Sequence, residues 1–150
     1  MTAAREASIS VREGSAADRT QAGTLVAPTT ARGRVSLAML REGRGQLWVA
    51  LACDGAREEL VGILLADTRA DGEIGQSVGY IQELLVHPVY RRRGVAMHLL
   101  DAAEHCFFEL QGLVAVTLMT TPENEGALRL YRSRGYGVDQ VHLRKRRPEE

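Results

Sequence analysis

The middle of the chain alternates between apolar runs and short turns. Residues 46–53 and 59–68 are rich in Leu and Val, and they are joined by the Asp-Gly-Ala-Arg segment 54–57, a hairpin signal. A second Asp-Gly turn, within residues 71–75, leads into an apolar run over residues 77–86. Consecutive strands separated by short turns predict an antiparallel meander.

After this meander the apolar spacing changes from that of a strand to that of a helix. Apolar residues then recur three or four positions apart, except for one adjacent leucine pair, which predicts an amphipathic helix over residues 94–111. The stripe consists of Ala96, Leu99, Leu100, Ala103, Phe107 and Leu110. A further strand is expected over residues 113–120, and a helix between neighbouring strands implies that they pair in parallel.

The two ends of the chain add further elements to this centre. We expect a strand over residues 8–12, helices over 20–26 and 30–42, a helix over 125–134, and a last strand over 136–144. The pattern therefore predicts a mixed sheet with helices on its faces.

Composition indicates one globular domain over residues 1–150, with residues 1–7 disordered. A formal net charge of zero argues against general binding to nucleic acid or membranes. The apolar runs are too short to span a bilayer and no signal sequence opens the chain, so we expect a cytoplasmic protein. Cys53 and Cys106 are isolated and predict buried, reduced thiols, and no histidine has the spacing of a metal ligand.

The segment between the strand 77–86 and the helix 94–111 carries the first candidate chemistry. His87-Pro88 ends the strand, and residues 91–96 read Arg-Arg-Arg-Gly-Val-Ala. A helix start has unpaired N–H groups and partial positive charge, so it attracts phosphate. This turn is neither a GxGxxG nor a Walker loop, and an ordinary corner with solvated arginines is the alternative.

Two segments of the chain resemble the signatures of the GNAT superfamily of N-acetyltransferases. They are Val86-His87-Pro88 followed by Arg91-x-x-Gly94-x-Ala96, and Asn124-x-x-Ala127-x-x-Leu130-Tyr131-x-x-x-Gly135-Tyr136. The resemblance implies an α/β (α+β) fold, with a mixed, mostly antiparallel central sheet of six to seven strands flanked by about four helices. It also implies acetyl-CoA as co-substrate, and an acceptor pocket lined by the two predicted N-terminal helices.

The resemblance further implies where the cofactor binds. The pyrophosphate would be held by backbone N–H groups of the turn, and the pantetheine arm would pair with the end of the strand before it. The implied residues are Leu84, Leu85, Val86, Arg91, Arg92, Arg93, Gly94, Val95, Ala96, Asn124 and Tyr131. Asn124 has a helix cap as its alternative role. Only fourteen residues follow Tyr136, which leaves open whether a partner subunit completes the sheet in a homodimer.

Glu83 is the candidate base because a carboxylate within an apolar strand is costly to bury, and burial would raise its pKa toward neutrality. A salt bridge to an arginine is the alternative role of Glu83. Because neighbours on a strand point to opposite faces, the other possibility is that Gln82 faces the substrate instead. Tyr131 matches the family tyrosine that often protonates the leaving thiolate; a core tyrosine is the alternative.

These residues predict an acetyl-CoA-dependent N-acetyltransferase. Because no cysteine occupies a motif position, we expect direct attack by a primary amine, of a small molecule, within a ternary complex. A non-catalytic acyl-CoA-binding regulatory module is one rival. Another is an enzyme that acetylates proteins or aminoacyl-tRNA, although the neutral charge weighs against a tRNA partner.

Overall fold

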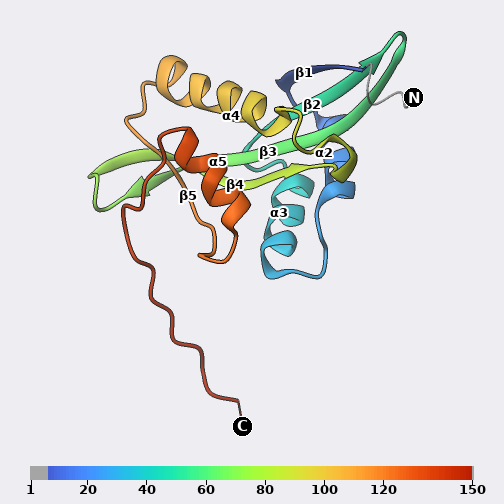
Figure 1. Ribbon diagram of the computed structural model, residues 1–150. Helices are drawn as coiled ribbons and strands as arrows, with labels where there is room; N and C mark the ends of the chain where they lie inside the picture. The colour runs from blue at the N-terminus through green and yellow to red at the C-terminus, as the bar shows by residue number, and fades with distance from the viewer. Residues whose placement is uncertain (1–6, 150) are drawn as a thin grey trace. The chain divides into compact units, whose positions relative to one another are not determined.

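The computed structural model describes residues 7–149, so most of the segment 1–7 predicted to be disordered lies outside the described residues. Contacts divide the chain into two compact units, Met1–Leu118 and Met119–Glu150, which are described separately below. The first unit is built on a five-stranded sheet of order β1-β2-β3-β4-β5 (Figure 1). Its strands are β1 (Ser8–Glu13), β2 (Gln46–Asp54), β3 (Arg57–Asp71), β4 (Gln76–Val86) and β5 (Val116–Leu118).

The pairing confirms a mixed, mostly antiparallel sheet. Strands β1 to β4 form an antiparallel meander, and β5 pairs in parallel with β4 after the helical crossover. The predicted count of six to seven strands is wrong, because the described residues form five. The strand expected over residues 136–144 is not formed. Among the described residues no strand pairs with that segment, and a β-favouring segment becomes a strand only where its backbone groups pair with a neighbouring strand.

Helices cover both faces of the sheet in the first unit. On one face lie α2 (Ala16–Ala22), the 3₁₀ turn η1 (Gly23–Leu25) and α3 (Ala31–Arg41). On the other lie α4 (Val95–His105) and the π-helical turn η3 (Cys106–Leu110). Strand β2 shows the division: Leu47, Val49 and Leu51 join the core with α2 and α3, whereas the Trp48 ring lies 5.8 Å from that of Phe107.

The apolar stripe predicted for residues 94–111 is interrupted at η3. Leu99, Leu100 and Phe107 are fully buried, but Leu110 is 72% exposed. A π turn inserts one extra residue into the helical repeat, which rotates the following side chains away from the stripe. Cys53 and Cys106 are both free, as predicted, but they are half-buried rather than buried.

The start of α3 is held by a close approach of two backbone segments. Thr30 caps the helix by accepting a hydrogen bond from the N–H of Gly33 at 2.9 Å. A Cβ atom at Gly33 would lie 1.7 Å from the carbonyl oxygen of Ala27, so only glycine fits there. This contact sets the position of the buried face of α3, which includes Ser36 and Met39.

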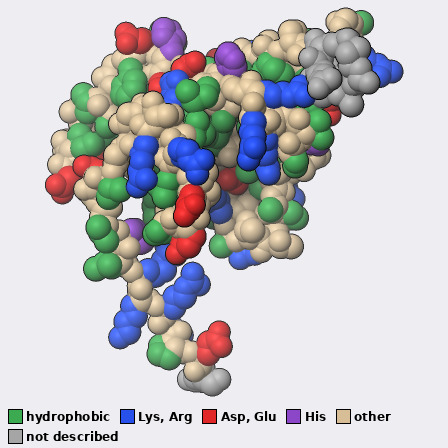
Figure 2. All heavy atoms as spheres, viewed as in Figure 1, with side chains coloured by type: hydrophobic (Ala, Val, Ile, Leu, Met, Phe, Trp, Pro, Cys, Tyr) green, Lys and Arg blue, Asp and Glu red, His purple; other side chains and the backbone are tan. Residues whose placement is uncertain are grey.

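The second unit contains α5 (Glu125–Ser133), followed by an extended tail. The four α-helices of the described residues agree with the prediction of about four. Basic side chains gather along the tail in Figure 2, where residues 144–147 read Arg-Lys-Arg-Arg. Among the residues described, none of the helices combines the length and the apolar character needed to cross a membrane.

Candidate active site

Strand β4 has an open edge at the point where the candidate site begins. Its pairing with β5 ends at Ile81, so residues 82–86 have a strand partner on the β3 side only, within the described part of the first unit. A β-bulge interrupts the β3–β4 register here, since Leu65 pairs with Glu83 and Ala66 with Ile81, leaving Gln82 as the extra residue. Bulges of this kind re-aim side chains and are common beside active sites.

The open edge contains the backbone predicted to pair with the pantetheine arm. Leu84, Leu85 and Val86 are all half-buried. The carbonyl of Val86 already accepts a hydrogen bond from Nε of Arg91 at 3.3 Å. A ligand lying along this edge would therefore meet strand positions with no partner strand before it reaches Val86. At the end of β4 it would meet the Arg91 side chain.

The turn after β4 has the backbone of an anion-binding site. Arg92 and Gly94 both have left-handed φ angles, of 64° and 76°, and Arg92 is a non-glycine residue for which that conformation is strained. Gly94 is the N-cap of α4 and no side chain caps the helix, so the N–H groups of its first turn are available to a ligand. Arg91, Arg92 and Arg93 are exposed around this turn. The turn thus suits a pyrophosphate.

Tyr90, which sequence analysis did not select, anchors this turn to the sheet. It lies in the 3₁₀ turn η2 (Pro88–Tyr90), is 5% exposed, and donates a hydrogen bond to Oε2 of Glu59 at 3.4 Å. The Arg93 guanidinium lies 5.6 Å above its ring. Burial, followed by the nearby charge of Glu59, raises the pKa of Tyr90. Its position directly before the arginine run is the only sequence signal that could have indicated this role.

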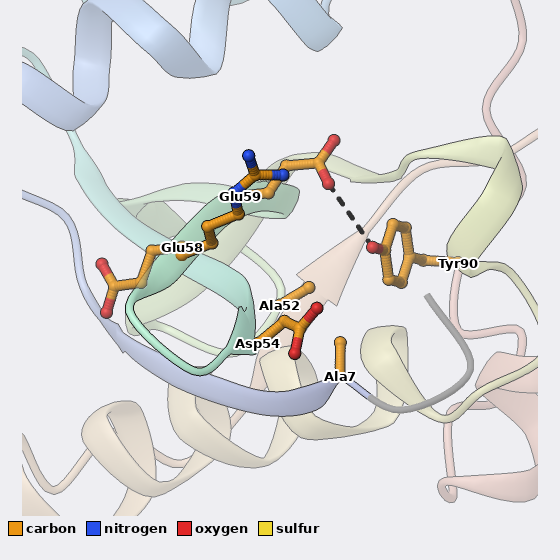
Figure 3. Close-up of a pocket in the computed structure, with 7 residues that line it drawn as sticks. Ala7, Ala52, Asp54, Glu58, Glu59 and Tyr90 are labelled. Carbon is orange, nitrogen blue, oxygen red and sulfur yellow. Dashed lines mark hydrogen bonds between the residues drawn. The ribbon is translucent and has the colours of Figure 1, made fainter. Parts of the chain in front are cut away.

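A pocket of about 320 Å³ lies beside Tyr90, at the β2–β3 hairpin. Figure 3 shows the Tyr90 hydroxyl directed at Glu59 across this pocket, with Asp54 and Glu58 on its rim. Its lining carries the carboxylates of Asp54, Glu58 and Glu59 and one guanidinium, that of Arg57, so its net charge is negative, which disfavours phosphate groups. The turn after β4 and this pocket are therefore different features.

Glu83 is buried on the face of β4 that packs against α3. Glu83 is 8% exposed, and its Oε1 accepts a hydrogen bond from the Ser36 hydroxyl at 3.2 Å. Burial raises the pKa of Glu83 above its ordinary value of 4.5, while the Ser36 hydrogen bond and the positive charge of Arg32 act in the opposite direction. The prediction of a buried carboxyl with a raised pKa is thus confirmed. The salt bridges of the described residues do not include Glu83.

The same helical face of the first unit has a groove between α2 and α3. Its volume is about 520 Å³, and Thr20, Thr24 and Leu37 are among its lining residues. Both predicted N-terminal helices thus form, and a groove lies between them. A role for this groove in binding the acceptor stays a prediction.

Asn124 and Tyr131 belong to the second unit. Oδ1 of Asn124 accepts a hydrogen bond from the N–H of Ala127 at 3.3 Å, so Asn124 is the N-cap of α5. Tyr131 is half-buried and its ring packs edge-on against Tyr136, with centroids 5.8 Å apart. Their contacts with the cofactor stay predictions.

An uncapped helix start beside an open strand edge, with a buried carboxylate on the same strand, suits acyl transfer from a nucleotide-linked thioester. A family model described as Acetyltransferase (GNAT) family matches residues 18–136. The chain therefore belongs to the GNAT acetyltransferase family, and acetyl-CoA is its co-substrate. No curated protein matches the chain significantly in sequence.

Solved structures share the fold over nearly the whole chain. The aminoglycoside N-acetyltransferase AAC(6')-Iy, solved in complex with CoA, aligns with a TM-score of 0.77 at 21% identity, covering 94% of this chain and 95% of that one. An aminoglycoside acetyltransferase from an uncultured soil metagenomic sample aligns at 0.65 and 25% identity, covering 95% and 99%. A ribosomal-protein-alanine N-acetyltransferase from Brucella melitensis biovar Abortus 2308 aligns at 0.72 and 18% identity, covering 94% and 100%.

Proposed function

We propose that this protein transfers the acetyl group of acetyl-CoA to a primary amine of a small molecule, by direct attack within a ternary complex. The observation that carries the proposal is Glu83, a buried carboxyl with a raised pKa on the strand whose edge is open. A base whose pKa lies closer to neutrality is better suited to accept the proton of an ammonium group.

Each step of this reaction has a candidate residue. Backbone N–H groups from Arg91 to Ala96 would bind the pyrophosphate. Glu83 would take a proton from the acceptor ammonium, directly or through water, so that the nitrogen can bond to the acetyl carbon. As the carbon–sulfur bond breaks, Tyr131 would donate its phenolic proton to the thiolate, and the second proton lost by the nitrogen would pass through water to restore the phenol. A phenol pKa near 10 is close enough to that of a thiol for this role.

A small-molecule acceptor is supported by two of the solved neighbours. Both AAC(6')-Iy and the soil-sample protein are described as aminoglycoside acetyltransferases, a class named for a small-molecule acceptor. The ribosomal-protein-alanine N-acetyltransferase shares the fold as well, which makes a protein N-terminus the competing acceptor. The groove between α2 and α3 is a candidate binding surface for either.

The proposal is tested by measuring thiol release from acetyl-CoA against a panel of amines that contains amino sugars, amino acids, polyamines and alanine-ended peptides. Turnover with a small amine is expected, whereas turnover with peptides alone would overturn the choice of acceptor. Binding of acetyl-CoA by calorimetry without turnover of any amine would favour a non-catalytic module.

Glu83→Gln tests the assigned base because it keeps the side-chain volume and removes the titrating group. It should lower kcat by about a hundredfold or more while acetyl-CoA affinity stays unchanged. Glu73→Gln, in the exposed β3–β4 turn, is the matched control and should retain the wild-type rate. Full activity of Glu83→Gln would contradict the assigned base.

A further inference from the structure

The hydroxyl of Ser36 lies between two hydrogen-bond acceptors in the core. Ser36 is fully buried on α3, and its Oγ lies 3.2 Å from Oε1 of Glu83 and 3.0 Å from the main-chain oxygen of Arg32. A hydroxyl has a single proton, so it can donate fully to only one of these acceptors at a time. A bond from a helical serine to the carbonyl four residues earlier is common. The contact with a carboxylate 47 residues away in the sequence is what distinguishes Ser36.

We propose that Ser36 is a positioning residue for Glu83: its hydroxyl holds the ionised carboxylate in one orientation and turns to the Arg32 carbonyl when Glu83 takes up a proton. This inference rests on the proposed function, in which Glu83 accepts the proton of the acceptor amine.

The two hydrogen-bonding patterns leave the buried groups satisfied in both protonation states. An ionised carboxylate is only an acceptor, so the Ser36 proton must point to Glu83 in that state. A protonated Glu83 can donate to Oγ of Ser36, while the Ser36 proton moves to the Arg32 carbonyl. The change requires only rotation about the Cβ–Oγ bond. Glu83 can therefore gain and lose a proton without moving heavy atoms and without leaving an unpaired polar group in the core.

The surroundings of the pair hold both side chains in place. Ser36 lies between Gly33 and Met39 on the buried face of α3, and the close contact of Gly33 with the preceding loop sets the position of this face. Glu83 lies opposite Leu65 of β3 in the strand register, and Leu65 is fully buried. The charged group that acts on Glu83 is Arg32, from α3 itself. Because the Ser36 hydroxyl donates directly to the carboxylate, its loss should have a measurable effect.

The experiment is a ¹³C NMR titration of the Glu83 carboxyl carbon in the full chain, with the resonance assigned by its loss in Glu83→Gln. Because the Ser36 hydrogen bond favours the ionised form, Ser36→Ala should raise the titration midpoint by about one pH unit, the size expected for one hydrogen bond to a carboxylate. Ser36→Thr, which keeps the hydroxyl, is the matched control and should leave the midpoint close to the wild-type value. An unmoved midpoint in a folded Ser36→Ala protein would overturn the proposal.

A second variant covers the case in which Ser36→Ala does not fold. Ser36→Cys has nearly the same size and only a weak S–H donor, so its midpoint should lie above the wild-type value. A midpoint at the wild-type value in Ser36→Cys would likewise count against the proposal.

Kinetics separate the positioning role from the proposed base. Over a pH series of kcat/KM with the best amine of the panel, the acidic limb should move upward in Ser36→Ala together with the NMR midpoint. If Glu83→Gln is fully active while Ser36→Ala shifts the midpoint, the base assignment is wrong and the hydrogen bond stands. If Glu83→Gln is inactive and the Ser36→Ala midpoint is unmoved, the base stands and the positioning role is wrong.

Discussion

The ion pair between β1 and α2 offers a direct test of how the first unit is held together. The guanidinium of Arg12 donates to Asp18, and both the backbone N–H and the hydroxyl of Ser15 donate to the same carboxylate. These hydrogen bonds, with that of Arg12 the largest effect, lower the pKa of Asp18 from 3.8 to about 2. Asp18 is 7% exposed and belongs to the capping box that begins α2. We predict that Asp18→Asn destabilises the fold.

The magnitude follows from the difference between the two pKa values. A difference of just under two units, at about 1.4 kcal/mol each, corresponds to about 2 kcal/mol of stability at neutral pH. Arg12 is 47% exposed, so screening by water makes this figure an upper limit. Because the folded-state pKa lies below the unfolded one, the contribution is complete above about pH 4 and is lost as pH falls toward 2. For a chain of this length, 2 kcal/mol lowers Tm by about 4–8 °C.

Urea unfolding of wild type and Asp18→Asn, at several pH values between 2 and 7, measures this contribution. The two free energies of unfolding should differ by about 2 kcal/mol at pH 7 and converge as pH falls. Asp67→Asn is the matched control, because Asp67 pairs with the exposed Arg69 and its loss should cost less than about 1 kcal/mol. Equal stability of wild type and Asp18→Asn at pH 7, or a difference that persists at pH 2, would refute the reasoning.

Three further predictions concern close packing, backbone strain and catalysis. Gly79→Ala should lower the free energy of unfolding by about 1–3 kcal/mol, because its Cβ would lie 2.7 Å from the ring of the fully buried Phe107. The control is Gly126→Ala, in α5 with open space around it, which should be neutral or stabilising by up to about 1 kcal/mol. Gly94→Ala should cost about 1–2 kcal/mol of stability in the same urea assay, because φ is +76° at this position and a residue with a Cβ is strained there. Wild-type stability of this variant would contradict the left-handed turn. Tyr131→Phe should lower kcat about ten- to a thousandfold in the thiol-release assay with little change in acetyl-CoA affinity by calorimetry, and an unchanged kcat would remove Tyr131 as the acid.

Much of the architecture follows from local patterns along the chain. The meander of β2, β3 and β4 is visible as apolar runs separated by Asp-Gly turns, and the crossover through α4 is visible as a change from strand to helix spacing. The polar Glu83 within an apolar run indicated a buried, perturbed carboxyl, and the structure bears out both properties. The strands, the turns and the crossover helix depend on residues within a few positions of one another, so periodicity and turn chemistry are enough to predict them.

Contacts between distant segments were not predictable in the same way. The meeting of Ser36 with Glu83 depends on the packing of α3 against β4, and the anchoring of Tyr90 by Glu59 depends on how η2 lies over the sheet. The bulge at Gln82 is a property of the β3–β4 register, which no pattern within β4 alone reveals. The absence of a sixth strand in the described residues has the same origin, because a β-favouring segment becomes a strand only where a neighbouring backbone pairs with it.

The order and type of the central elements, the left-handed turn before α4 and the family signatures can all be read from the amino-acid sequence. The side chains around Glu83, the contacts that hold the turn and the edge of the sheet became known from the fold alone. The difference arises from the distance along the sequence over which each interaction acts. Helix and strand periodicity depend on a few neighbouring residues, whereas the pKa of a carboxyl and the partners of a strand are set by groups tens of residues away.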